Sequence, residues 1–291
     1  MMTTRPRRIV FQGEAGANSH MACRDVYPDY EAVACATFED AFQAISDGNA
    51  TLGMIPIENS VAGRVADIHH LMPTSGLHII GEYFLPLHHY LLASPGASPD
   101  TVKTVHSHVM ALGQCRKAIR KFGLRAEVHA DTAGAARMVA ELGDPTKAAI
   151  ASRLAAEIYG LEVLASDIED EDHNTTRFVV LSKEPNWAAR GIGPIITSFI
   201  FRVRNVPAAL YKAMGGFATN GVNMTKLESY QLEGEFFATQ FFADIEGHPE
   251  DPNVKLAFEE LGFFTREFRI LGVYRASPFR ERIKEPKAAA K

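Results

Sequence analysis

The stretch Ile195-Ile-Thr-Ser-Phe-Ile-Phe-Arg-Val-Arg204 decides the fold of the C-terminal part of this chain. Its odd-numbered positions share one face of an extended strand, because strand side chains alternate with a period of two. A helix is expected to open at Pro207 and to end at Asn220-Gly221. The chain therefore enters this region as a strand followed by a helix.

The residues after Gly221 complete a recognisable order of elements. Strands are predicted over 222–230 and 235–245 with a turn at Glu233-Gly234 between them, and a helix is predicted to start at Asp251-Pro252. A last strand is predicted over 265–274. The order βαββαβ is that of a ferredoxin-like split βαβ fold.

Upstream, short apolar runs alternate with helix-period segments. The predicted strands are 9–11, 32–36, 52–57, 102–105 and 148–151. One helix follows the N-cap Thr37 and ends before Gly48, and a second follows Asp131 and ends at Gly143. A third is expected to carry Leu112, Cys115, Ile119 and Phe122 on one side and to end before Gly123. This α/β alternation predicts a mostly parallel sheet covered by helices. The proline- and glycine-containing break at 183–194 is the predicted domain boundary.

Composition limits the possible partners and compartments. The 291 residues carry a formal net charge of −5, which argues against a nucleic-acid partner. No apolar run approaches the roughly 20 residues of a membrane helix, so no membrane partner is expected. The three cysteines are scattered without Cys-x-x-Cys spacing. A cytoplasmic protein is the expectation.

Several predicted strand ends in the first domain run into helices through small or hydroxylated residues. These are 13–19, 57–60, 105–108, 131–134 and 151–152. Free N–H groups at helix starts favour anions, so their convergence would bind a small polyanion. Each of these residues can also be only an N-cap.

Other kinds of site are not expected. The glycines at 13 and 16 lack the third glycine of a dinucleotide fingerprint, and no phosphate-binding P-loop occurs, so no cofactor is predicted. The histidines at 69–70, 88–89, 106 and 108 do not form H-E-x-x-H, and no carboxylate or cysteine completes a ligand spacing. No metal site is predicted.

Five motifs, in this order, resemble those of prephenate dehydratases. They are Phe11-Gln-Gly-Glu-Ala-Gly-Ala-Asn-Ser19, Gly53-Met-Ile-Pro-Ile-Glu-Asn-Ser60, Ser107-His108 with Gln114-Cys115, Asp131-Thr-Ala-Gly-Ala-Ala136 and Asn174-Thr-Thr-Arg-Phe178. The tail, with Asn223-Met-Thr-Lys-Leu-Glu-Ser229, is similar to the ACT domain of these enzymes. The resemblance covers residues 8 to about 275. It implies cofactor-free conversion of prephenate to phenylpyruvate in L-phenylalanine biosynthesis, with feedback control by L-phenylalanine.

The resemblance also implies site residues. The catalytic set is Thr176, Asn59, Ser107, Gln114 and Glu58, with Thr176 as a positioned hydrogen-bond donor near the leaving hydroxyl. The substrate-binding set is Arg177, Ser19, Ser60, Thr132, Ser152, Asn174 and Phe178. Arg177 is a candidate for bidentate carboxylate recognition, with a structural salt bridge as an equal alternative. The effector set is Asn205, Pro207, Ala208, Ala209, Leu210, Asn223, Glu228 and Ser229.

The expected architecture follows from the same family. Residues 1–185 form a two-lobed catalytic domain like type II periplasmic binding proteins, with lobes at 1–85 plus 177–182 and at 86–176. Residues 195–275 form the ACT domain and 276–291 a tail. A monofunctional homodimer or tetramer is expected. Arogenate dehydratase and a non-catalytic amino-acid sensor remain alternatives. Ala208 stands where the family has glycine, and Tyr230-Gln231 replaces Arg-Pro, which puts the strength of phenylalanine inhibition in question.

Overall fold

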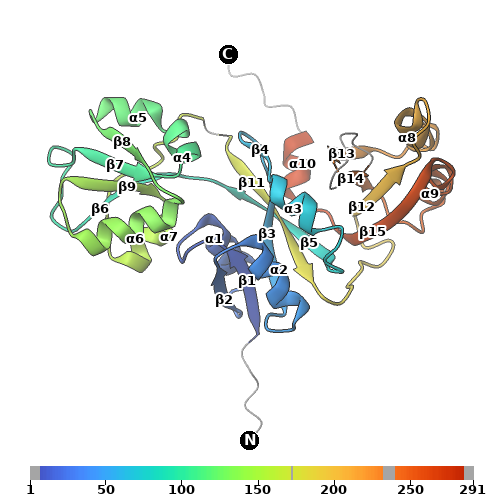
Figure 1. Ribbon diagram of the computed structural model, residues 1–291, viewed down its shortest axis with the longest axis horizontal. Coiled ribbons are helices and arrows are strands. Elements are labelled where there is room, and N and C mark those ends of the chain that lie inside the picture. The colour runs from blue at the N-terminus through green and yellow to red at the C-terminus, as the bar shows by residue number, and fades with distance from the viewer. Residues whose placement is uncertain (1–6, 172, 232–239, 285–291) are drawn as a thin grey trace, which may run out of the picture. The chain divides into compact units, whose positions relative to one another are not determined.

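The computed structural model describes residues 7–171, 173–231 and 240–284, apart from the side chains of His69, Ile283 and Lys284 (Figure 1). The chain forms two compact units. The first comprises residues 1–65 and 83–178, and the second comprises residues 66–82 and 179–291. The predicted break at 183–194 contains no helix or strand and lies within the second unit. The limits of the catalytic domain at 1–185 and of the ACT domain at 195–275 remain predictions.

A six-stranded sheet contains the N-terminal strands. Its order is β2-β1-β3-β11-β5, with β4 paired to β3. The strands are β1 (Arg8–Gln12), β2 (Glu31–Cys35), β3 (Leu52–Asn59), β4 (Gly63–Arg64), β5 (His78–Pro86) and β11 (Thr175–Ser182). β1 is parallel to both β2 and β3. The chain passes between the two units within β5 and β11.

The helices of this region are α1 (Asn18–Val26), α2 (Phe38–Ser46) and α3 (Ala66–Leu71). The predicted cap of α2 is confirmed: the Thr37 hydroxyl accepts from the Asp40 N–H, and the Asp40 side chain accepts in return. Gly48 has the predicted left-handed backbone, with φ of 74°. Ala41, Phe42 and Ile45 are the buried face, so the helical period identified this element correctly.

A five-stranded sheet has the order β10-β6-β9-β7-β8. Its strands are β6 (Tyr90–Ala93), β7 (Thr104–Ser107), β8 (Arg125–Val128), β9 (Lys147–Ala151) and β10 (Glu162–Ala165). β7 is parallel to β8 and β9, whereas β6 is antiparallel to β9 and β10. The sheet is therefore mixed rather than mostly parallel, because β6 runs opposite to β9 at its centre.

Helices cover both faces of the five-stranded sheet. They are α4 (Val109–Gln114), α5 (Arg116–Lys121), α6 (Thr132–Leu142) and α7 (Arg153–Tyr159). Along β9, Ala149 packs in the cluster with α6 and α7, while Ala148 and Ile150 pack in the cluster with α4. Burial of both faces explains why β9 reads as a continuous apolar run. Asp131 and Gly143 cap α6 as predicted.

The helix predicted through Leu112 and Phe122 is two helices, which is a correction. α4 ends at Gln114 and α5 begins at Arg116. The carboxylate of Asp170 accepts from the N–H groups of Arg116 and Lys117 at 3.0 Å each, and the Asp170 N–H donates to the Gln114 carbonyl at 2.6 Å. A residue distant in sequence thus caps the start of α5 and interrupts the helix.

The second unit contains a four-stranded sheet with the order β13-β14-β12-β15. Its elements are β12 (Ile195–Val203), α8 (Ala209–Thr219), β13 (Met224–Tyr230), β14 (Gln240–Glu246), α9 (Pro252–Phe264), β15 (Thr265–Arg275) and α10 (Phe279–Lys284). From β12 to β15 the order is the predicted βαββαβ, with adjacent strands antiparallel. Phe199, Phe201 and Val203 pack with α8 and α9 in one core cluster. The predicted turn at 233–234 lies outside the described residues.

Helix α8 begins at Ala209, two residues later than predicted. Ala208 is its N-cap and has φ of 59°, so the backbone is left-handed before the helix starts. An alanine in this region is strained, because its Cβ approaches the following carbonyl. The glycine that the resemblance leads one to expect here would adopt it freely.

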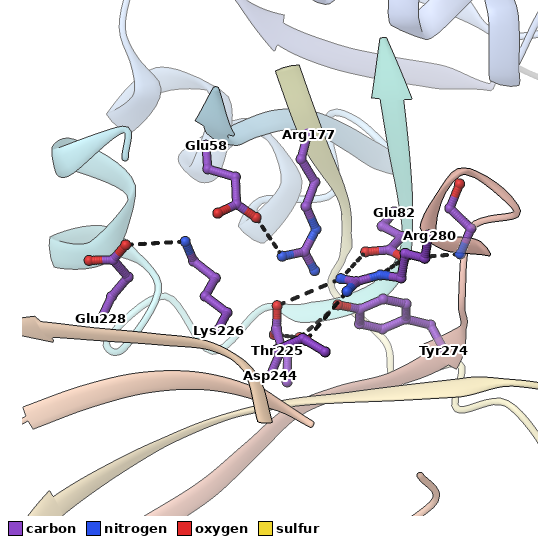
Figure 2. Close-up of polar contacts among 11 residues, drawn as sticks. Glu58, Glu82, Arg177, Thr225, Lys226, Glu228, Asp244, Tyr274 and Arg280 are labelled. Atoms are coloured by element: carbon purple, nitrogen blue, oxygen red, sulfur yellow. Dashed lines mark hydrogen bonds and ion pairs between the residues drawn. The ribbon is translucent and has the colours of Figure 1, made fainter. Parts of the chain in front are cut away.

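A buried polar network ties α10 to the rest of the second unit (Figure 2). The Arg280 guanidinium binds both carboxylate oxygens of Glu82, at 2.6 and 2.8 Å, and lies 3.9 Å from Asp244. Asp244 also accepts from the hydroxyl of Ser198, which contacts the Tyr274 hydroxyl at 2.7 Å. Both carboxylate side chains are fully buried. The segment predicted as a tail therefore contributes a cation to the interior.

Within the described residues, no helix combines the length and hydropathy that crossing a bilayer would require.

Candidate functional site

A cavity of about 290 Å³ lies in the first unit and brings together residues from five of the sequence motifs. Six of the predicted site residues line it: Ser19, Asn59, Gln114, Thr132, Thr176 and Phe178. Further lining residues include Gln12, Asn18, Leu87, His89, His108 and Asp131. The volume is near the lower end of the range for small-molecule sites.

Three helix N-termini contribute to the lining. Ala17 and Asn18 come from the start of α1, His108 from the start of α4, and Asp131 and Thr132 from the start of α6. Backbone N–H groups in the first turn carry partial positive charge and favour anionic groups. No lysine or arginine is among the described lining residues. Anion binding here would therefore depend on backbone amides and neutral side chains.

Two predicted helix starts do not contribute in this way. The chain after Asn59 turns into β4 rather than a helix, because the Asn59 side-chain oxygen accepts from the N–H groups of Val61 and Ala62, at 3.0 and 2.7 Å. Ser152 caps α7 and its hydroxyl donates to the Gly16 carbonyl. Ser152 lies outside the cavity lining, where it links α7 to the loop before α1.

A chain of side-chain hydrogen bonds runs along the cavity. The Asn59 amide nitrogen donates to the Thr176 hydroxyl at 2.9 Å and to the Asn174 side-chain oxygen at 2.8 Å. The Asn174 amide nitrogen donates to the Gln114 side-chain oxygen at 2.9 Å, which also contacts His89 Nε2 at 3.0 Å. Five polar side chains from four segments are thereby fixed relative to one another.

The direction of these bonds leaves the Thr176 proton available. Its oxygen accepts from Asn59, so its own O–H is free to donate to a group in the cavity. A hydroxyl that accepts one hydrogen bond is a stronger donor in the next, because chains of hydrogen bonds polarise one another. Thr176 is only 8% exposed, which limits competition from water.

His89 is held as a neutral ring. Burial lowers its pKa below 6.5, although contacts with Gln114 and Glu169 act in the opposite direction. The Gln114 side-chain oxygen can only accept, so Nε2 is the nitrogen that carries the proton. The His89 backbone N–H donates to the Glu169 carboxylate at 2.9 Å. His89 is therefore positioned at both its backbone and its ring.

Buried Arg177 forms an ion pair with the partly exposed Glu58, and neither residue lines the cavity (Figure 2). Arg177 Nη1 lies 2.8 Å from Glu58 Oε1, and its guanidinium lies 5.9 Å from the centroid of the Phe84 ring. Arg177 points away from the face shared by Thr176 and Phe178, since neighbouring strand residues face opposite sides. This geometry favours the structural salt bridge over carboxylate recognition.

Three other predicted residues also lie outside the lining and make structural contacts. The Ser107 hydroxyl is fully buried and donates to the Ile150 carbonyl at 2.6 Å. The Ser60 hydroxyl donates to the His173 carbonyl at 2.7 Å and accepts from the Thr175 N–H at 2.9 Å. Asn174 supports the cavity through Asn59 and Gln114. These residues hold the segments that carry the lining.

Sequence analysis assigned no site role to His89 or His108, although both line the cavity. His89 was considered only as a metal ligand, whereas His108 belonged to the predicted strand end at 105–108 and to the third motif. His108 caps α4, with Nδ1 accepting from the Met110 N–H at 3.3 Å. Their position just after β5 and β7 was the available signal, since loops after strands carry the sites of α/β folds.

The predicted effector residues fall at two ends of the four-stranded sheet. Residues 205–210 follow the end of β12, where Arg202 pairs with Gln240 and Gln240 pairs with Tyr230. Asn223 lies at the opposite end, where its side chain donates to Glu246 at 3.0 Å. Glu228 accepts from Lys226 at 3.4 Å, and Ser229 is exposed. Tyr230 is buried and accepts from Gln240 at 2.9 Å, and burial raises its pKa to about 12.

Comparison with known proteins places these features in one family. A model described as prephenate dehydratase matches residues 9–186. The bifunctional N-acyl-homoserine lactone acylase/prephenate dehydratase of Komagataeibacter europaeus is 50% identical over 276 residues, which are 95% of this chain and 98% of that protein. Arogenate dehydratase 2 of Petunia hybrida is 37% identical over 281 residues, covering 92% of this chain and 71% of the relative.

A solved structure agrees with these relatives. Prephenate dehydratase from Arthrobacter aurescens in complex with L-Phe matches with a TM-score of 0.85 at 29% identity, covering 92% of this chain and 90% of that chain. The match to the family description extends over more than half of the chain, and several relatives exceed 30% identity. The chain therefore belongs to the prephenate dehydratase family.

Proposed function

We propose that this protein converts prephenate to phenylpyruvate, carbon dioxide and water in the cavity lined by Thr176 and Asn59. The observation that carries the proposal is the hydrogen-bond chain that leaves the Thr176 proton free to donate into a cavity with no lysine or arginine among its described lining residues. The two sheets of the first unit are the two lobes of a fold like that of type II periplasmic binding proteins. The βαββαβ segment is the ACT regulatory domain.

Substrate binding depends on the helix N-termini. Prephenate carries two carboxylates, and the starts of α1, α4 and α6, which contribute to the lining, can offer backbone N–H groups to them. The side-chain amides of Asn18 and Gln114, which also line the cavity, can donate further hydrogen bonds to the carboxylates. The carboxylate that departs as carbon dioxide is favoured to leave where water is excluded.

The reaction requires a donor at the ring hydroxyl. The C–C bond to the leaving carboxylate breaks, its electron pair enters the ring, and the ring C–O bond breaks to release hydroxide, which takes up one proton from solvent to give water. Thr176 is too weak an acid to supply that proton by full ionisation at neutral pH. It acts as a positioned donor that stabilises the developing negative charge on the leaving oxygen, with Asn59 fixing its orientation.

A turnover assay tests the proposal. Phenylpyruvate formation from prephenate is followed at neutral pH, with arogenate offered in parallel and in equimolar competition. Arogenate replaces a keto group by an ammonium group, and Asp131 is the one carboxylate among the described lining residues. Its side chain already caps α6, with Oδ1 accepting from Gly134 at 2.7 Å, so prephenate is the expected preferred substrate. Absence of turnover of both substrates would refute the proposal and favour a non-catalytic sensor.

A second candidate activity rests on one relative. The Komagataeibacter protein, which is 50% identical and matched over 98% of its length, is described as both an N-acyl-homoserine lactone acylase and a prephenate dehydratase. N-acyl-homoserine lactone should therefore be offered to the purified protein, with release of homoserine lactone and fatty acid as the readout. Activity that persists in Thr176→Val would assign amide hydrolysis to groups other than those of the dehydratase step.

Control by L-phenylalanine is part of the proposal. The Arthrobacter aurescens enzyme is described with L-Phe bound, and the corresponding region here contains Ala208 with a left-handed backbone and a buried Tyr230. Because residues 205–210 and Asn223 lie at opposite ends of one sheet, a complete effector site would combine these segments from two ACT domains. We therefore expect a homodimer or a dimer of dimers, and monomer alone in sedimentation at micromolar concentration would contradict this.

A further inference from the structure

Three potential metal-ligating atoms meet outside the cavity, at His88, Asp167 and Glu169. His88 Nδ1 lies 2.8 Å from Glu169 Oε1 and 3.1 Å from Asp167 Oδ1. All three ligand atoms lie within 4.8 Å of one another. Because 81 residues separate His88 from Glu169, no spacing rule applied to the sequence could have found this group.

Backbone hydrogen bonds fix the two segments that carry these side chains. The His89 N–H donates to Glu169 Oε2 at 2.9 Å, and the Ile168 N–H donates to the His89 carbonyl at 3.1 Å. One oxygen of Glu169 is thus used by the backbone, and the other faces His88. The group is therefore held by the fold and does not depend on chance contact between two flexible side chains.

The negative charges in this group exceed the positive charge that its imidazole can supply. The Glu169 side chain is only 8% exposed, and among the described residues no lysine or arginine forms an ion pair with Asp167 or Glu169. An imidazole supplies at most one positive charge for two carboxylates, whereas a divalent cation supplies two. Partly buried anions are stable when they are paired or coordinate a metal.

The separations fit a coordination sphere. Zinc and magnesium bind nitrogen and oxygen at about 2.0–2.2 Å. Adjacent ligands around such an ion lie about 3.0 Å apart in an octahedron and about 3.4 Å apart in a tetrahedron, from those same bond lengths. The observed 2.8 and 3.1 Å are close to the octahedral separation, and the third pair of ligand atoms lies within 4.8 Å.

We propose that His88, Asp167 and Glu169 bind one divalent first-row transition-metal ion, such as Mn²⁺ or Zn²⁺. One imidazole and two carboxylates form a mixed donor set that suits this class. His88 and Asp167 are 52% and 64% exposed, so water completes the coordination and the ion exchanges with solvent. The ion joins the segment at 167–169 to the segment that carries His89, and so makes the position of this cavity residue depend on metal.

Calorimetric titration of the full-length, chelator-treated protein with MnCl₂, and separately with ZnCl₂, tests this site without any substrate. One saturable Mn²⁺ site per chain is expected, and His88→Asn and Asp167→Asn should each weaken binding by at least about tenfold, because loss of even an outer-shell partner typically costs about 10–100-fold. His173→Asn is the matched control, because its Nδ1 lies 3.8 Å from Glu171 in an exposed pair outside this group. It should bind as the wild type does.

Three results would overturn the proposal: no saturable binding at millimolar metal, unchanged binding in both ligand variants, or an equal loss in His173→Asn. Far-UV circular dichroism checks that each variant is folded. If His88→Asn does not fold, Asp167→Asn alone decides the test, because Asp167 is exposed and its one ion pair among the described residues is with His88. None of these results depends on whether the protein dehydrates prephenate.

Discussion

Replacing Ala208 by glycine should stabilise this protein, although glycine usually destabilises. Ala208 has φ of 59° as the N-cap of α8. A left-handed backbone costs an L-residue about 1–2 kcal/mol. Glycine removes that strain but adds unfolded-state entropy worth about 0.4–1 kcal/mol. The difference between the middle values of the two ranges gives an expected gain of about 0.8 kcal/mol in the free energy of unfolding.

Urea unfolding followed by tryptophan fluorescence can measure this change. The chain has a single tryptophan, Trp187, which lies in the second unit together with Ala208. Ala218→Gly is the matched control, because Ala218 is an exposed residue of the same helix. There the substitution should cost about 0.5–1 kcal/mol. The two variants should therefore shift the urea midpoint in opposite directions.

A loss of stability in Ala208→Gly equal to that in Ala218→Gly would refute the reasoning. It would mean that residue 208 has ordinary helical or extended backbone and stores no strain. The same variant also bears on control by phenylalanine, since it restores the residue expected from the family at that position. Stronger inhibition by phenylalanine together with higher stability would connect the strain to the effector segment.

Further predictions concern the buried groups. Arg280→Ala should lower the free energy of unfolding by about 3–5 kcal/mol in urea melts, because it removes the paired cation from buried Glu82; an unchanged midpoint would contradict this. Asn59→Ala should lower kcat by a larger factor than it raises KM, since it frees the Thr176 hydroxyl to rotate. A fall in kcat and a rise in KM by the same factor would contradict this role of Asn59. The lowered pKa of His89 means that the unfolded chain takes up a proton first, so stability should fall as the pH drops below about 6.5. In His89→Gln that part of the pH dependence should disappear.

Much of the fold could be predicted because local signals and packing agree. Thr37, Asp131 and Pro252 start helices where their capping chemistry indicates, and the βαββαβ order follows from periodicity together with such local start and stop signals. The failures have non-local causes. The break between α4 and α5 depends on Asp170, and the reversed direction of β6 depends on its pairing with β9.

The candidate site was predicted less completely, for a related reason. Motifs identified Asn59, Gln114 and Thr176, which do meet in the cavity. They could not separate lining residues from neighbours that face the other side of the same strand, such as Arg177. Along β11, successive side chains face opposite sides of the sheet. Which set of side chains lines the cavity depends on which face of the strand packs against the rest of the unit.

The measurement that tests the central claim most directly is kcat for prephenate in Thr176→Val and Thr176→Ser. Valine preserves the shape of the side chain and removes the donor, whereas serine keeps the hydroxyl. If Thr176 donates to the leaving oxygen, Thr176→Val should lose about 100-fold or more in kcat with KM little changed, as for loss of one transition-state donor. Thr176→Ser should stay within about tenfold of the wild type, since its donor remains. A Thr176→Val enzyme with the kcat of the wild type would contradict the account.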